Sequence, residues 1–155
     1  DSRTTANDTS GDTLVKLLTG AGHSLGEKRI VPDEIYQIRA IVSQWIADDG
    51  INAVITTGGT GITGRDSTPE AVKVLLDKEI EGFGEVFRAV SYDEIGTSTI
   101  ASRAVSGVAN ATFIFCLPGS TGACRTAWGK IISHQLDYRT RPCNLVELMP
   151  RVLEK

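Results

Sequence analysis

Hydrophobic residues recur three and four positions apart in several stretches of the chain, the spacing that places them on one face of an amphipathic helix. Leu14, Leu17 and Leu18 form such a face behind the capping candidates Thr9 and Ser10. Glycine or proline bounds most of these stretches, as is usual where helices end or begin. The pattern predicts helices within the ranges 10–19, 34–49, 68–76, 82–90 and 122–132.

Short runs rich in β-branched and aromatic residues lie between these helices. They predict strands at 28–32, 51–57, 103–108 and 112–117. The run 51–57 is typical of a parallel strand covered on both faces. Only three residues, 109–111, separate the last two runs, so these form an antiparallel hairpin. The alternation of strands and helices predicts one α/β domain over 1–155, with a mainly parallel sheet and one antiparallel strand.

The composition of the chain excludes several classes of function. The 155 residues suit one domain, and 41% of them are hydrophobic, enough to build a core. With 16 Lys+Arg against 19 Asp+Glu the net charge is -3, so we expect neither a nucleic-acid partner nor a membrane surface. Cys116, Cys124 and Cys143 are too few and too scattered for a disulfide framework or a four-ligand zinc site. These features predict a cytoplasmic protein.

A glycine-rich loop, Thr57-Gly58-Gly59-Thr60-Gly61, follows the strand predicted at 51–57. In open α/β folds, ligands bind at the carboxyl ends of the strands. Glycines let successive backbone N–H groups face an anion, so this loop is a candidate phosphate cradle assisted by the hydroxyls of Thr57 and Thr60. A tight strand-to-helix turn with no ligand is the structural alternative.

Two familiar phosphate motifs almost match residues 59–64, but their context excludes both. The spacing Gly-x-Gly-x-x-Gly is present, yet the next helix begins only near Thr68 and no acidic strand end follows at the distance of a dinucleotide-binding fold. In a P-loop, a lysine and a serine or threonine would follow, whereas this chain has Arg65 and Asp66. The loop therefore belongs to a different kind of site, and its position favours Arg65 as a phosphate contact.

Two carboxylates are expected beside the loop. Asp33 and Asp66 each lie just before a predicted helix, which in a parallel sheet places both at one edge. They would repel a bound anion unless Mg²⁺ lay between them and the phosphate oxygens. The alternative role for each is capping of backbone amides. Four other arginines are expected to form surface ion pairs: Arg103, Arg125, Arg139 and Arg141.

At these residues the sequence resembles the molybdenum cofactor biosynthesis protein B (MoaB) family, with its relatives MogA and the G domain of gephyrin. The most specific block is Thr56-Thr57-Gly58-Gly59-Thr60-Gly61 followed by Arg65-Asp66-Ser67-Thr68-Pro69-Glu70. The remaining matches are Asp8-Thr9-Ser10-Gly11, Val31-Pro32-Asp33-Glu34, Glu81-Gly82-Phe83-Gly84-Glu85 and Leu117-Pro118-Gly119-Ser120. From Asp8 to Ser120, these stretches span about three quarters of the chain and follow the family's order.

The resemblance implies a three-layer α/β/α fold that assembles into trimers or hexamers. It also implies a molybdopterin site, with the terminal phosphate on Gly58–Gly61 and with Ser10 and the turn Pro118-Gly119-Ser120 nearby. Active relatives adenylylate molybdopterin with ATP and Mg²⁺ and release pyrophosphate. In that reaction Asp66 is assigned to Mg²⁺ and the nucleotide phosphates, and Asp33 to supporting the metal or orienting the reacting phosphate.

The chain also departs from the family pattern. Relatives begin with a hydrophobic strand ending in Ser-Asp-Arg, whereas this chain starts at Asp1-Ser2-Arg3, so we expect a first strand to be missing. The residues Ser120-Thr121-Gly122 replace the Pro-Lys pair of the MogA branch, which removes a basic phosphate contact. Two functions remain open: a molybdopterin adenylyltransferase, and a non-catalytic molybdopterin-binding or carrier oligomer in the same pathway.

Overall fold

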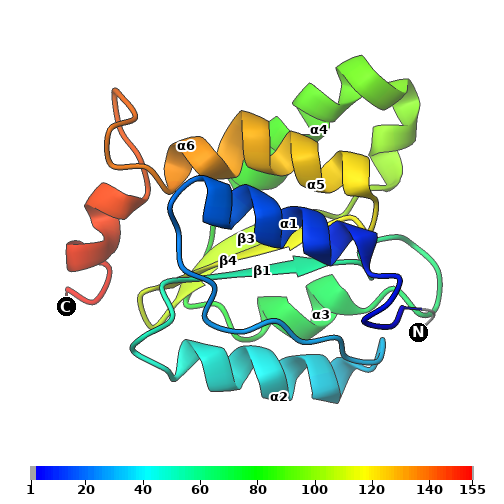
Figure 1. Cartoon of the computed structure of the whole chain (residues 1–155), viewed down its shortest axis with the longest axis horizontal. Helices are drawn as coiled ribbons and strands as arrows, with labels where there is room; N and C mark the ends of the chain where they lie inside the picture. Colours follow the sequence, from blue (N-terminus) through cyan, green and yellow to red (C-terminus); the bar gives the residue numbers. More distant parts are fainter. Residues whose placement is uncertain (1–2, 155) are drawn as a thin grey trace.

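The computed structural model describes residues 3–154, which are arranged around a four-stranded sheet (Figure 1). The strands are β1 (Ala53–Thr57), β2 (Lys78–Glu79), β3 (Val105–Ala109) and β4 (Thr112–Leu117), in the spatial order β1-β4-β3-β2. β1 pairs with β4 in parallel, whereas β3 is antiparallel to both of its neighbours. Three strands thus share one direction and β3 opposes them, which confirms the predicted mixed sheet.

Helices cover both faces of this sheet. They are α1 (Thr9–Gly20), α2 (Ile35–Ile46), α3 (Thr68–Lys73), α4 (Glu81–Ile95), α5 (Thr121–Ala127), the π-helical η2 (Trp128–Ile132), α6 (Ser133–Gln135) and the 3₁₀ helices η1 (Gly96–Ala101) and η3 (Val146–Arg151). In Figure 1, α1, α4 and α5 lie above the sheet, and α2 and α3 lie below it. The α/β/α layering is therefore confirmed. Within residues 3–154, no helix combines the length and apolar character needed to cross a bilayer.

The sequence of β4 shows why the sheet is covered on both sides. Phe113, Phe115 and Leu117 belong to the core cluster under α1, α4 and α5. Ile114 and Cys116 belong to the cluster formed with α2 and α3. Since successive side chains of a strand point to opposite faces, a run without exposed positions needs a helical layer on each face. Every residue of β4 is buried.

The three cysteines lie in different surroundings. Cys116 and Cys124 are buried and Cys143 is exposed, and all three are free thiols. Burial disfavours the thiolate and raises the pKa of Cys116 to about 12, and it raises the pKa of Cys124 as well. The two core cysteines therefore behave as small apolar residues.

The strand predicted at 28–32 is wrong, because this segment is irregular chain. A strand needs a neighbour for its N–H and C=O groups. Within residues 3–154, β1 is the edge strand on this side of the sheet, and the cavity lined by both β1 and residues 22–31 lies between it and the segment. Side chains hold the segment instead: Lys28 pairs with Asp8 at 2.9 Å, and Trp45 Nε1 donates to Glu27 at 2.7 Å. The first strand expected from the family pattern lies outside the described residues and stays a prediction.

Two smaller predictions also change. Asp8, and not Thr9 or Ser10, caps α1, since its carboxylate accepts a hydrogen bond from the Gly11 N–H at 3.0 Å. β2 was not predicted at all, because two exposed residues carry no hydrophobic alternation. The strands at 51–57, 103–108 and 112–117 lie where the sequence placed them, to within two residues. The helix predicted at 34–49 is α2, which ends three residues earlier, at Ile46.

Candidate functional site

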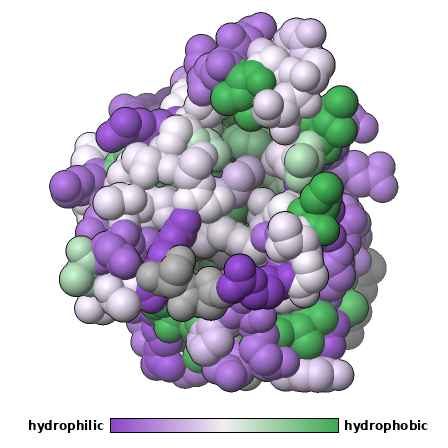
Figure 2. All heavy atoms as spheres, turned by 90° about the vertical axis from the view of Figure 1, so that its right-hand side faces the viewer, coloured by the Kyte–Doolittle hydropathy of each residue, from purple (hydrophilic) through white to green (hydrophobic). Residues whose placement is uncertain are grey.

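The two parallel strands β1 and β4 end side by side, and each leads into a turn. Thr57 is in register with Leu117, and the Gly58 N–H donates to the Leu117 carbonyl at 2.9 Å. A Cβ atom on Gly119 would lie only 3.2 Å from Gly58 Cα, so the two turns are in close contact. Figure 2 views this edge, the side to which β1 points, and shows strongly hydrophilic side chains at its centre.

The first turn, called here the glycine loop (residues 58–66), depends on its glycines for its shape. Gly58 and Gly59 have φ values of 108° and 65°, in the region that side chains disfavour. A Cβ atom on Gly59 would also overlap Thr68 Oγ1 and lie 3.3 Å from Thr68 Cβ. Thr68, in turn, donates its N–H to the Gly59 carbonyl at 3.0 Å. The loop is therefore closed onto the start of α3.

Both predicted carboxylates lie against this loop. Asp66 Oδ2 accepts hydrogen bonds from the Thr63 N–H at 2.8 Å and from Thr63 Oγ1 at 2.6 Å. These bonds, the side-chain one first, hold the pKa of Asp66 below its ordinary value of 3.8. Asp33 Oδ1 lies 3.5 Å from the position that a Cβ atom on Gly59 would take. The loop thus has an ionised carboxylate at Gly61 and a second acidic side chain at Gly59.

The second turn, Pro118-Gly119-Ser120, is tied to the first and starts a helix. Thr57 Oγ1 donates to the Pro118 carbonyl at 3.1 Å and lies 3.3 Å from Cys124 Sγ. Ser120 Oγ accepts the Ala123 N–H at 3.1 Å and so caps α5. The hydroxyls of Thr57 and Ser120, predicted to bind ligand, therefore also hold the two turns in shape.

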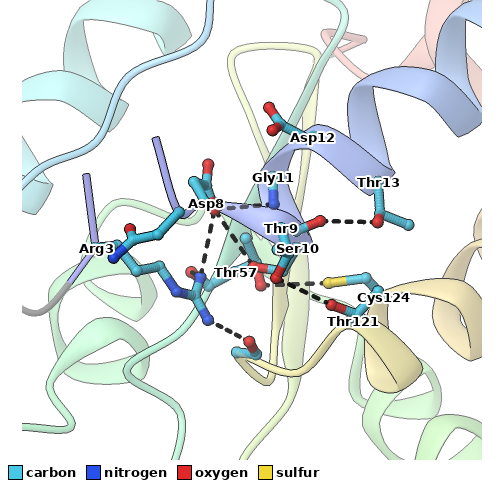
Figure 3. Close-up of polar contacts among 12 residues, drawn as sticks. Arg3, Asp8, Thr9, Ser10, Gly11, Asp12, Thr13, Thr57, Thr121 and Cys124 are labelled. Atoms are coloured by element: carbon cyan, nitrogen blue, oxygen red, sulfur yellow. Dashed lines mark hydrogen bonds and ion pairs between the residues drawn. The ribbon is translucent and has the colours of Figure 1, made fainter. Parts of the chain in front are cut away.

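The N-terminus of α1 contributes a cluster of charges that sequence reasoning did not identify (Figure 3). Arg3 reaches across both turns: Nη1 donates to the Thr57 carbonyl at 3.4 Å and Nη2 to the Gly119 carbonyl. Its Nη1 lies 3.8 Å from Asp8, which is 5% exposed. Burial alone would raise the pKa of Asp8, but hydrogen bonds from Lys28 and the Gly11 N–H outweigh it and lower the pKa. Ser10 is 1% exposed, with its Oγ 3.5 Å from Asp8 Oδ1.

A cavity of about 1140 Å³ opens beside these groups. Its lining includes most of the predicted site: Asp33, Thr57, Gly58, Gly59, Thr60, Gly61, Asp66, Pro118, Gly119 and Ser120. Arg3 and Asp8 line it too, whereas Ser10 and Arg65 do not. The cavity continues along β1, between α1, α2 and the chain at 22–31, so it extends well beyond the phosphate-sized space over the glycine loop.

The donor set allows one kind of metal site. Across residues 3–154, no group of three or more His, Cys, Asp or Glu side chains could hold a metal ion on its own. Mg²⁺, however, is often bound by one or two carboxylates together with substrate phosphates. Asp33 and Asp66, which approach the same loop from either end of Gly59-Thr60-Gly61, fit that mode. A self-sufficient zinc or calcium cage does not fit.

Several known proteins are similar to this chain in sequence and in fold. A family model described as "Probable molybdopterin binding domain" matches residues 2–138. Molybdenum cofactor biosynthesis protein B of Escherichia coli (strain K12) is 59% identical over 138 residues, covering 89% of this chain and 81% of that protein. The protein of the same name from Bacillus cereus (strain ATCC 14579) is 45% identical over 141 residues, covering 90% of this chain and 83% of that protein.

A comparison with solved structures points to the same family as the sequence comparisons. A crystal structure of Molybdenum cofactor biosynthesis protein B matches with a TM-score of 0.85 at 47% identity, covering 88% of this chain and 85% of that one. The sequence match and the structural match each extend over most of both proteins. The chain that carries the glycine loop and its two acids therefore belongs to the molybdenum cofactor biosynthesis protein B family, whose domain is described as molybdopterin-binding.

Proposed function

We propose that this protein is a Mg²⁺-dependent adenylyltransferase that activates molybdopterin with ATP. A phosphate oxygen of molybdopterin attacks the α-phosphorus of ATP, the bond to the β-phosphate bridge breaks, and pyrophosphate leaves with the bonding electrons. The observation that carries the proposal is the placement of Asp33 and Asp66 on the glycine loop, where both line the cavity. An anion-binding loop alone would not need two acids.

Each part of the site has a role in this reaction. The glycine loop receives the terminal phosphate of molybdopterin through the backbone N–H groups of Gly59 and Thr60, because those of Gly58 and Gly61 are already bonded to Leu117 and Asp66. The positive ends of α1 and α5 favour the same charge. Thr9 of α1 and Thr121 of α5 lie 3.4 Å apart through their Oγ1 atoms, so both helices start at this place. The Pro118-Gly119-Ser120 turn and Arg3 bound the phosphate from the other side. Such positioning is the main contribution that a protein makes to phosphoryl-type transfer.

Asp66 holds Mg²⁺ against the nucleotide phosphates, and Asp33 supports the metal or orients the reacting phosphate. When bound, Mg²⁺ neutralises charge on the phosphoryl oxygens. Asp66 suits this role because its lowered pKa keeps it ionised throughout the neutral range. Its Oδ2 is already held by Thr63, which fixes the carboxylate in one orientation.

The alternative function is a non-catalytic molybdopterin carrier. The hydrogen bonds that occupy Asp66 Oδ2, Thr57 and Ser120 favour it, because they give these side chains a structural task without chemistry. The two functions differ in one product only, which is adenylylated molybdopterin.

The test is Asp66→Asn, assayed with molybdopterin, ATP and Mg²⁺ for the adenylylated product and for pyrophosphate. We expect turnover to fall by about 10²-fold or more, as for loss of a group that stabilises transition-state charge, while molybdopterin binding is kept. Asp93→Asn, at an exposed acid of α4, is the control and retains activity. A wild-type protein that binds molybdopterin but forms no adenylylated product contradicts the enzyme and supports the carrier.

We also propose that the protein is a homo-oligomer, a trimer or hexamer, in the cytoplasm. Tyr92, Ile95 and Ile100 on α4 and η1 are 56%, 54% and 79% exposed. These elements lie at the upper right of Figure 1, and the upper part of Figure 2 shows hydrophobic side chains there. Exposed apolar side chains of this size favour an interface between proteins. Ile100→Asp is expected to shift the mass measured by light scattering toward the monomer.

A further inference from the structure

Arg103 forms an ion pair with the half-exposed Glu70, as predicted, and it also contacts the glycine loop at several points. Its Nε donates to the Gly61 carbonyl at 2.7 Å and its Nη2 to the Asp66 carbonyl at 2.8 Å. Its Nη1 is paired with the Glu70 carboxylate, and its own N–H donates to the Thr60 carbonyl at 3.1 Å. One residue thus holds both ends of the segment 60–66 and the first turn of α3.

Topology explains how a residue so far along the chain reaches this loop. Arg103 precedes β3, and Val105 at the start of β3 is in register with Cys116 near the end of β4. Because β3 runs opposite to β4, its beginning lies at the edge where β1 and β4 end. The residue before an antiparallel strand is thereby brought to the edge where parallel strands place their ligands.

The contacts of Arg103 bear directly on the orientation of Asp66. In a trans peptide, the carbonyl of one residue and the N–H of the next point in opposite directions. The backbone N–H of Arg103 holds the Thr60 carbonyl, a contact that substitution of the side chain leaves in place, and the Gly61 N–H on the other side of that peptide donates to the Asp66 carboxylate. The guanidinium holds the next carbonyl, that of Gly61. The guanidinium holds the Asp66 carbonyl as well. Both the backbone of Asp66 and a donor to its side chain are therefore fixed by the same residue.

We propose that Arg103 is a positioning residue, which sets the shape of the glycine loop and aims the Asp66 carboxylate into the cavity. Arg103 is not among the residues that line this cavity, so it acts through the loop without touching substrate. Glu70 holds its guanidinium in place. The planar guanidinium can donate to two carbonyls and a carboxylate at the same time, whereas a lysine ammonium cannot reproduce this arrangement of donors. The catalytic part of this inference rests on the proposed adenylyltransferase function.

The experiment compares Arg103→Met and Arg103→Lys with Arg139→Met, a control at an exposed arginine that pairs with Asp137. Amide hydrogen exchange of residues 58–66 is expected to speed up about 10-fold or more in Arg103→Met, because those peptides lose their anchors, and less in Arg103→Lys. The melting temperature and the exchange of β4 provide the test of folding. This readout needs neither substrate nor activity.

Kinetics then separate positioning from general damage. A misplaced Asp66 lowers kcat, and we expect about a 10²-fold loss in Arg103→Met with KM for molybdopterin changed less than about threefold. Arg103→Lys recovers part of kcat, and the double variant Arg103→Met/Asp66→Asn is no slower than Asp66→Asn alone. Unchanged loop exchange in a folded Arg103→Met protein, or fully additive losses in the double variant, would overturn the proposal. The two proposals can fail separately. If Arg103→Met speeds up exchange of the loop but the wild-type protein forms no adenylylated product, the role of Arg103 in shaping the loop is supported and only the adenylyltransferase function is rejected.

Discussion

The glycine loop and the Pro118-Gly119-Ser120 turn follow neighbouring parallel strands but are built in different ways. The glycine loop uses positive φ values and is held by side chains from distant parts of the chain, such as Arg103. The second turn is short, and Ser120 stabilises it locally by capping the helix that follows. Thr57 and Arg3 also bond to the second turn, so both turns have tertiary contacts. Only the first turn needs positive φ values, and only the second is stabilised by a helix cap of its own.

The largest effect is expected from matched glycine substitutions in the two turns. Gly59→Ala places a side chain at a φ of 65° and against the buried Thr68, and we expect it to lower the free energy of unfolding by about 2–4 kcal/mol. Gly119→Ala has an ordinary φ and meets the flexible end of Arg3 first, so about 1 kcal/mol or less is expected. Urea denaturation measures both, and equal losses would contradict the difference between the turns.

The second largest effect on stability is expected at Asp8, whose charge holds Arg3 and Lys28 beside both turns. Its pKa lies below the ordinary 3.8 in the folded protein, so its contribution is present above that pH and is lost as the pH falls through the folded pKa. Asp8→Asn is expected to cost about 1–3 kcal/mol at pH 7, typical of removing the charged acceptor from hydrogen bonds such as those of Lys28 and the Gly11 N–H.

The pH dependence provides the control for this prediction. Wild type and Asp8→Asn are expected to converge in stability as the pH is lowered below about 4, because protonation removes the same charge that the variant lacks. Thermal unfolding at a series of pH values measures the gap. A gap that stays constant from pH 7 to pH 3 would show that Asp8 acts only through its shape.

The smallest effect is expected at Ser120. Ser120→Ala removes the cap of α5 and is expected to cost about 1 kcal/mol, while Ser120→Gly costs only a few tenths. Since the lost hydrogen bond lies between Ser120 and Ala123 and does not involve the glycine loop, hydrogen exchange of that loop should not change. Faster exchange at residues 58–66 in Ser120→Ala would show that the two turns are coupled and that the comparison drawn above is too simple.

The sequence predicted the elements whose pattern reflects burial. The run 112–117 is predicted as a strand from its β-branched and aromatic residues, and the structure buries it on both faces. The loop at 58–61 is predicted because several glycines directly follow a strand. The run at 28–32 has similar residues but is not a strand, because β-propensity does not reveal whether a pairing edge is available. The hydrophobic pattern thus predicts which elements form the layers of the fold better than it predicts which strands pair.

The site was predicted only in part, for a related reason. The glycines and the two acids lie next to predicted strands and helices, so their position was visible in the sequence. Arg103 is 37 residues from Asp66, and it reaches the loop only because β3 is antiparallel. The link between Arg3 and Gly119 spans 116 residues. Contacts of this kind follow from the order of the strands, which the hydrophobic pattern does not contain.

The different surroundings of the three cysteines have a practical consequence. Cys143 is exposed and does not line the cavity, while Cys116 and Cys124 are enclosed in the core. A thiol-reactive fluorophore should therefore attach at one position in the native protein, without any cysteine having to be replaced. A single dye at Cys143 would thus label the protein without changing its sequence, for use in tests of the proposed ligand binding and assembly.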